Sequence, residues 1–132
     1  MTTTTPTKRI LLVDDELDNS LIFTMALEDN GFLVDRFTDP QLALSNFRAD
    51  SYDLLLIDIK MPKMSGFELL REIKKIDNKV YVCFITAFGE GYSEEFERQF
   101  SNSFTATVTA VDFIRKPIAI DDLVKKVKSK LE

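Results

Sequence analysis

Short apolar runs alternate with segments of helical periodicity along nearly the whole sequence. The predicted strands lie at residues 10–13, 32–37, 53–57, 80–85 and 111–114, and residues 10–13 are apolar throughout. A continuous apolar run is typical of a strand buried on both faces of a parallel sheet, and regular alternation with helices indicates the α/β class. Because crossovers between parallel strands are right-handed, only a few sheet topologies are possible for five such strands. We therefore predict a doubly wound, five-stranded parallel sheet of order 2-1-3-4-5.

Helical periodicity and capping residues place the helices between these strands. The helices are expected at about residues 18–30, 40–49, 93–104 and 119–131, with one more that carries Phe67, Leu70, Ile73 and Ile76. Gly31 is expected to end the first helix in a left-handed conformation, and Asp39 to cap the second in front of Pro40. The apolar stripe expected to face the core from the first helix consists of Leu17, Leu21, Ile22 and Met25.

The length and composition fit one globular domain. The chain has 132 residues, of which 45% are hydrophobic and 30% are charged. We expect residues 1–7 to be a disordered lead and residues 8–132 to form the domain. The sequence has no apolar run long enough to span a bilayer, and its N-terminus lacks the apolar core of a secretory signal. A cytoplasmic protein is therefore expected.

The charge balance and the missing residue types exclude several functions. The 22 acidic and 17 basic residues give a net charge of −5, which argues against direct binding of nucleic acid. There is no histidine, and we interpret the one cysteine, Cys83, as part of the core. A Ser-His-Asp triad, a Cys-His pair and a histidine-ligated zinc site are thereby excluded. Any chemistry must depend on carboxylates, hydroxyls and lysine.

Polar residues gather where the predicted strands end. Asp14 and Asp15 follow the first strand, Asp58 the third and Thr86 the fourth, and Lys116 comes just after the fifth. The carboxyl ends of strands in an open parallel sheet share one edge, so these groups are expected to converge. Three carboxylates together need a cation, and oxygen ligands without His or Cys favour Mg²⁺. The sequence thus predicts a magnesium site at which a carboxylate attacks phosphorus.

Four motifs in a fixed order carry a resemblance to a known family. They are Asp14-Asp15, the segment DIKMPKMSG at residues 58–66, Thr86-Ala87 and Lys116-Pro117. Together they resemble the receiver domain of bacterial-type response regulators, including the single-domain chemotaxis kind, over residues 8–131. The resemblance implies a flavodoxin-like fold and a phosphorylation-dependent switch of a two-component system. Such a switch is not an enzyme beyond its own phosphorylation and dephosphorylation.

The resemblance also assigns roles to the acidic residues. Asp58 would accept a phosphoryl group from a histidine kinase or a phosphotransfer protein. Asp15, Asp58 and the main-chain carbonyl of Lys60 would bind Mg²⁺ directly, while Asp14 would act partly through water.

Lys116 and two further residues would carry the switch. Lys116 would pair with the acidic cluster and then with the phosphoryl oxygens, and the resemblance implies a cis peptide bond between Lys116 and Pro117. The hydroxyl of Thr86 would move to the phosphoryl group, and Phe113 would turn inward behind it. The surface formed by the fourth helix, fifth strand and fifth helix would then change shape for a downstream protein target.

Other interpretations of the same residues stay open. Asp14 and Asp15 also suit the cap of a helix, Lys116 suits a protein surface, and Phe113 suits the core. A receiver-like interaction module would act without phosphorylation. A Mg²⁺-dependent aspartyl-phosphate phosphatase typically needs an acid two residues past its nucleophile, where this chain has Lys60. A flavin-binding protein needs a phosphate-cradling loop after the first strand, where this chain is acidic.

The segment between Thr86 and Lys116 departs from the family by about two extra helical turns. The additional residues fall around 90–110, in the region that normally signals, so the sequence does not identify the downstream target. We expect a monomer or a phosphorylation-dependent dimer with no membrane partner. The chain is expected either to act alone by docking onto partners or to be part of a longer regulator.

Overall fold

The computed structural model describes residues 7–87 and 110–131, with residues 86, 87, 110 and 111 described by their main chain only. Within these residues a five-stranded parallel sheet has the order β2-β1-β3-β4-β5. Its strands are β1 (Arg9–Val13), β2 (Leu33–Phe37), β3 (Leu54–Asp58), β4 (Tyr81–Ala87) and β5 (Ala110–Lys116). The predicted fold class and strand order are confirmed.

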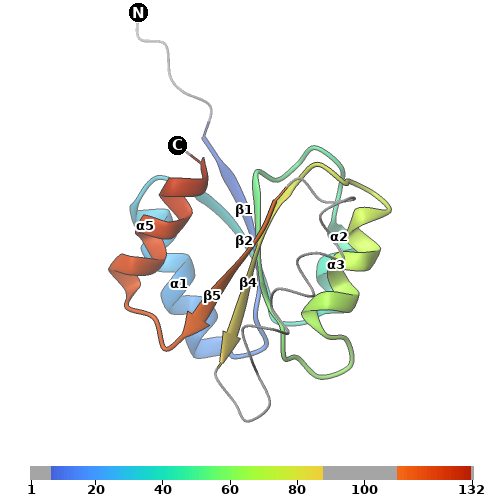
Figure 1. Ribbon diagram of the computed structural model, residues 1–132, viewed down its shortest axis with the longest axis horizontal. Helices are drawn as coiled ribbons and strands as arrows, with labels where there is room; N and C mark the ends of the chain where they lie inside the picture. The colour runs from blue at the N-terminus through green and yellow to red at the C-terminus, as the bar shows by residue number, and fades with distance from the viewer. Residues whose placement is uncertain (1–6, 88–109, 132) are drawn as a thin grey trace, which may run out of the picture.

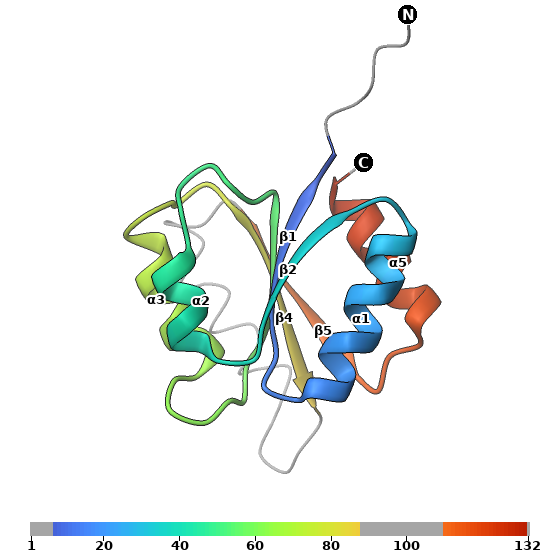
Figure 2. The same ribbon diagram turned by 180° about the vertical axis from the view of Figure 1, so that it is seen from behind.

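The described helices cover both faces of the sheet (Figure 1). Helices α1 (Leu17–Asp29) and α5 (Ile120–Leu131) lie side by side on one face, and α2 (Pro40–Asn46) and α3 (Gly66–Lys74) lie on the other. The view from behind shows the same two layers (Figure 2). The helix predicted at residues 93–104 and the threonine-rich residues 105–109 lie outside the described residues.

Apolar strand residues fill a core on each side of the sheet. On the α2–α3 side lie Leu11, Val13, Leu55 and Ile57, while Ile10, Leu12, Leu54 and Leu56 lie on the α1–α5 side. All eight side chains are at most 1% exposed. Successive residues of a strand point to opposite faces, so a continuous apolar run is what a sheet covered on both sides requires. Cys83 is buried on the α1–α5 side, as predicted.

The apolar stripe predicted for α1 is wrong. The four residues of that stripe, Leu17, Leu21, Ile22 and Met25, are between 39% and 62% exposed. The helix instead buries Ser20, Phe23 and Leu27 against the sheet. Helix α1 is apolar on most of its circumference, so periodicity alone does not single out its buried face. A large apolar surface consequently stays open on the outside of this helix.

Local signals at the helix ends agree with the sequence. Asp39 accepts a hydrogen bond from the Gln41 N–H at the start of α2, and Pro40 occupies the first helical position. Gly31 has a φ of 92°, the left-handed conformation expected after α1. Helix α3 ends at Lys74, so the predicted core residue Ile76 lies beyond it and is exposed.

Gly66, the first residue of α3, packs directly against the end of β3. Its N–H donates to the Ile59 carbonyl at 2.8 Å. A Cβ at this position would clash with the main-chain oxygen of Asp58 and would lie 3.0 Å from Ile57 Cγ2. Only glycine therefore lets the loop after Asp58 fold back this closely onto the strand.

We expect Gly66→Ala to destabilise the fold more than Gly31→Ala. At Gly31 nothing lies within 4 Å of an added Cβ, so the cost of that variant is the strain of alanine in the left-handed conformation, about 1–2 kcal/mol. Gly66→Ala must also move main-chain atoms, and we expect about 2–3 kcal/mol or more. Urea unfolding of both variants measures the difference. Equal losses of stability would contradict the close packing of Gly66.

Candidate functional site

The ends of β1, β3 and β5 bring three charged side chains to one edge of the sheet. Asp14 follows β1 directly, Asp58 is the last residue of β3, and Lys116 is the last residue of β5. These strands run parallel, so their carboxyl ends lie together. The side chains of Asp14 and Asp58 are almost fully buried, with the whole residues 0% and 4% exposed. Buried carboxylates are costly unless a counter-charge lies close by.

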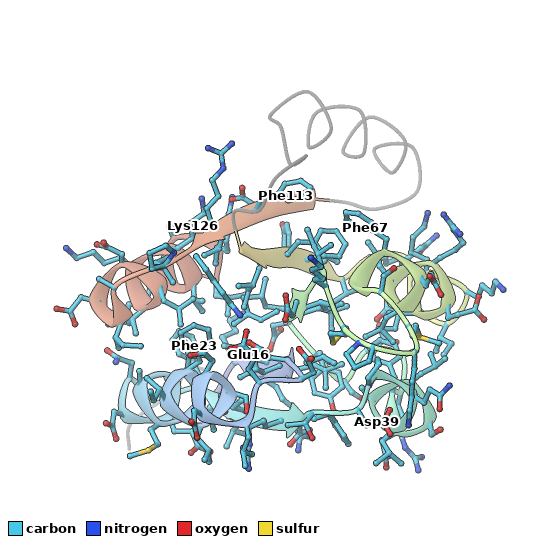
Figure 3. The ribbon with its side chains drawn as sticks, turned by 90° about the horizontal axis from the view of Figure 1, so that it is seen from below. Glu16, Phe23, Asp39, Phe67, Phe113 and Lys126 are labelled. Atoms are coloured by element: carbon cyan, nitrogen blue, oxygen red, sulfur yellow. The ribbon has the colours of Figure 1, made fainter. Side chains whose placement is uncertain are left out.

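The ammonium group of Lys116 provides that counter-charge. Its Nζ lies 3.2 Å from Asp14 Oδ2, 3.4 Å from Glu16 Oε1 and 3.9 Å from Asp58 Oδ2. Figure 3 looks onto this edge and shows Glu16 near the middle of it, beside one end of α1. We call Asp14, Asp15, Glu16, Asp58 and Lys116 the acidic site. One ammonium group is shared there by three carboxylates.

Burial dominates the electrostatics of Asp58. Burial raises the pKa of this carboxyl to about 7. The positive charge of Lys116 acts to lower this pKa, whereas the charge of Asp14 and the neighbouring Asp15 side chain act to raise it. The Lys60 N–H donates to Asp58 Oδ1 at 3.4 Å and favours the ionised form. In the absence of a metal ion, this raised pKa favours the protonated form of Asp58 more than in an exposed aspartate.

The pKa of Lys116 moves upward from its ordinary value. Burial acts to lower this pKa, but the negative charges of Asp58, Asp14 and Glu16 together outweigh it. The lysine therefore stays protonated and holds a full positive charge inside the acidic site.

The oxygen atoms of the acidic site fit a hard divalent ion. Carboxylate oxygens of Asp14, Glu16 and Asp58 lie within 4.8 Å of one another, and no histidine or cysteine lies among them. Carboxylates of this kind, completed by water, are the donors that Mg²⁺ prefers. Among the described residues Asp15 is not part of this closest group, although it contributes to the raised pKa of Asp58.

Glu16 is the residue that the sequence analysis did not select. It nevertheless occupies the third place in the close carboxylate group. The one sequence feature that points to a role for Glu16 is its position directly after Asp14 and Asp15. Its N–H donates to Asp14 Oδ1 at 2.9 Å, which folds the chain so that the two side chains approach Lys116 together.

The remaining predicted site residues lie on the strands beside Asp58. The main chain of Thr86 is at the end of β4 and pairs with Arg115, so it belongs to the same edge of the sheet. Its hydroxyl lies outside what the structure describes. Phe113 is buried in β5, with its ring 5.6 Å from that of Phe84. Phe84 in turn contacts the ring of Phe67 of α3 edge-on at 5.0 Å.

Two further observations bear on the sequence predictions. The peptide bond between Lys116 and Pro117 is cis, as the resemblance implied. Of the helices in residues 7–87 and 110–131, none combines the length and the apolarity needed to cross a membrane.

Known proteins resemble this chain in sequence and in fold. Residues 10–128 match the sequence profile described as "Response regulator receiver domain". The response regulator receiver protein CpdR of Brucella abortus is 40% identical over 81 residues, which cover 61% of this chain and 68% of CpdR. The transcriptional regulatory protein RprY of Bacteroides fragilis is 26% identical over 121 residues, 92% of this chain and 48% of RprY. The chain thus spans about half the length of RprY.

Solved structures agree with the sequence comparison. A CheY-like receiver domain protein from Methanospirillum hungatei superimposes with a TM-score of 0.78 at 31% identity, covering 95% of this chain and 94% of the other. A receiver domain protein from Clostridium thermocellum gives a TM-score of 0.73 at 27% identity, with 94% of each chain covered. The chain belongs to the response regulator receiver domain family.

Proposed function

We propose that Asp58 of this chain accepts a phosphoryl group and that Mg²⁺ bound in the acidic site assists the transfer. Phosphorylation-dependent switching in two-component systems is the general function of receiver domains. The observation that carries the proposal is the position of Asp58, buried at the sheet edge within reach of Asp14 and Lys116. Its carboxylate is thereby the group that both a metal ion and a phosphoryl donor can approach.

The proposed chemistry is nucleophilic displacement at phosphorus. An oxygen of the Asp58 carboxylate forms a bond to phosphorus as the bond to the donor nitrogen of a phosphohistidine breaks. Lys116 meets the charge on the transferred oxygens, and a Mg²⁺ ion held in the acidic site would supply further positive charge there. Asp15, Asp58 and the Lys60 carbonyl are proposed to hold the ion, with Asp14 acting through water. Lys60 offers no carboxylic acid, which disfavours turnover of phosphate esters.

The proposed switch connects this chemistry to β5. The hydroxyl of Thr86 is drawn to the phosphoryl oxygens, and Phe113 responds by repacking. The contact of the Phe113 ring with Phe84, and of Phe84 with Phe67, supports such repacking, because the three rings form one packed row from α3 across β4 to β5. A downstream protein that binds β5 and α5 would detect the change.

The open apolar surface of α1 supports a protein as the phosphoryl donor. One residue of this surface, Ile22, also lines a cavity of about 550 Å³ between α1 and the segment after β5. This cavity is lined by Asn19, Ile22, Phe23, Lys116, Pro117, Ile118 and Ile120. Because Lys116 belongs to both the cavity and the acidic site, a partner seated here would lie beside the acidic site. We propose a helical histidine kinase or phosphotransfer domain as that partner.

Asp58→Asn is expected to abolish phosphorylation, because the amide is not a nucleophile of this kind. The wild type, incubated with acetyl phosphate and Mg²⁺, should gain the mass of one phosphoryl group in intact-protein mass spectrometry. Asp29→Asn, at the exposed far end of α1, makes the same chemical change away from the site and should behave as wild type. A phosphorylated Asp58→Asn protein would contradict the assignment.

The raised pKa of Asp58 predicts a pH-dependent stability in metal-free protein. Between about pH 4 and about pH 7 the folded state binds a proton that the unfolded state has lost, so this contribution to stability disappears as pH rises through about 7. With EDTA present, Asp58→Asn should therefore exceed wild type in stability at pH 8, on the order of 1–3 kcal/mol, and by much less near pH 5. Thermal unfolding at both pH values measures this. Parallel curves for the two proteins would show that burial of Asp58 carries no such cost.

Ile22→Lys tests the donor surface. A lysine here places a charge in the apolar cavity beside Lys116, so docking of a protein donor should weaken. With a histidine kinase that phosphorylates the wild type, we expect the ratio of kinase-dependent to acetyl-phosphate-dependent rate to fall at least about tenfold. Leu42→Lys, an exposed apolar residue of α2 on the opposite face, is the matched control. An unchanged ratio for Ile22→Lys would place the donor elsewhere.

A further inference from the structure

Glu16 is held at both oxygens of its carboxylate although its side chain is 59% exposed. Its Oε1 lies 3.4 Å from Lys116 Nζ, and its Oε2 accepts a hydrogen bond from Asn19 Nδ2 at 3.1 Å. Glu16 also occupies the N-cap position of α1, but its side chain makes no capping hydrogen bond. The side chain instead lies between Asn19, in the first turn of α1, and Lys116. A role in capping α1 does not explain this orientation.

The position of the lysine ammonium reflects this contact. Lys116 lies within hydrogen-bonding distance of Asp14 and Glu16, whereas 3.9 Å separates it from the nearest oxygen of Asp58. Within the acidic site, Asp14 is fully buried, whereas Glu16 lies on the side that faces solvent. The ammonium is thus shared with a carboxylate at the mouth of the site instead of being committed to Asp58.

We propose that Glu16 is a positioning residue that keeps Lys116 in this resting place and competes with the incoming phosphoryl group for its ammonium. The inference rests on the proposed phosphorylation of Asp58. Before transfer, Glu16 satisfies the lysine charge in place of phosphoryl oxygens. For transfer, the ammonium must leave Glu16, so the Glu16 contact raises the free energy needed to form the phosphorylated state. The residue thereby sets how readily this receiver domain accepts phosphate.

The Glu16 carboxylate, which opposes phosphorylation, is expected to favour binding of the metal ion. A negative charge beside Asp14 and Asp58 attracts a divalent cation, and it also keeps Lys116 from pairing more tightly with those two acids. Removing the charge of Glu16 should therefore weaken binding of Mg²⁺. It should at the same time strengthen binding of an anionic phosphoryl mimic once Mg²⁺ is saturating. A residue that merely supports the fold would change both affinities in the same direction.

Glu16→Gln tests the proposal, because it keeps the size of the side chain and removes its charge. Calorimetric titration with Mg²⁺ alone gives one affinity, and titration with beryllofluoride at saturating Mg²⁺ gives the other. We expect Mg²⁺ binding to weaken and beryllofluoride binding to tighten, each by about two- to fivefold, since the pair is partly solvent-exposed. Glu28→Gln, at the exposed end of α1, removes the same charge far from the site and should match wild type.

The outcomes separate this inference from the proposed function. Wild-type protein that binds neither Mg²⁺ nor beryllofluoride contradicts the proposed function itself. Wild type that binds both, with Glu16→Gln unchanged or weakened in both titrations, overturns the role of Glu16 and leaves the role of Asp58 intact. Opposite shifts in Glu16→Gln, absent from Glu28→Gln, support the positioning role.

Discussion

Two carboxylates buried at the end of a parallel sheet are the constraint on which the rest of this structure depends. Asp14 and Asp58 lose their hydration in the fold, and only the Lys116 ammonium lies close enough among the described side chains to offset both charges. The remaining imbalance appears as the raised pKa of Asp58. Such a site is incomplete without a further cation or a proton, which is why it suits a reversible association with Mg²⁺.

The fold supplies this arrangement through ordinary packing. Apolar side chains on both faces of β1 and β3 fix these strands side by side, and the register pairs Val13 with Ile57, one residue before each acid. Gly66 then lets the following loop return against Asp58. The unfavourable electrostatics of the site are thus maintained by a core that has no part in the chemistry.

The sequence predicts the sheet and the convergence of Asp14, Asp58 and Lys116 well, because each apolar run ends abruptly in a polar residue. It fails on the face of α1, whose apolar residues surround the helix and leave Phe23 and Leu27 indistinguishable from exposed neighbours by periodicity. It also passes over Glu16, since the direction of an exposed side chain depends on tertiary contacts. The placement of the Thr86 hydroxyl and of residues 88–109 stays a prediction.

A crystal structure with Mg²⁺ and beryllofluoride is the most direct test of the central claim, that this buried acidic site holds a metal ion and presents Asp58 for modification. The account predicts beryllofluoride on the Asp58 carboxylate, Mg²⁺ among the neighbouring acids, and the Lys116 ammonium on a fluorine atom instead of on Glu16. Beryllofluoride absent from Asp58, or Mg²⁺ bound away from these acids, would contradict it.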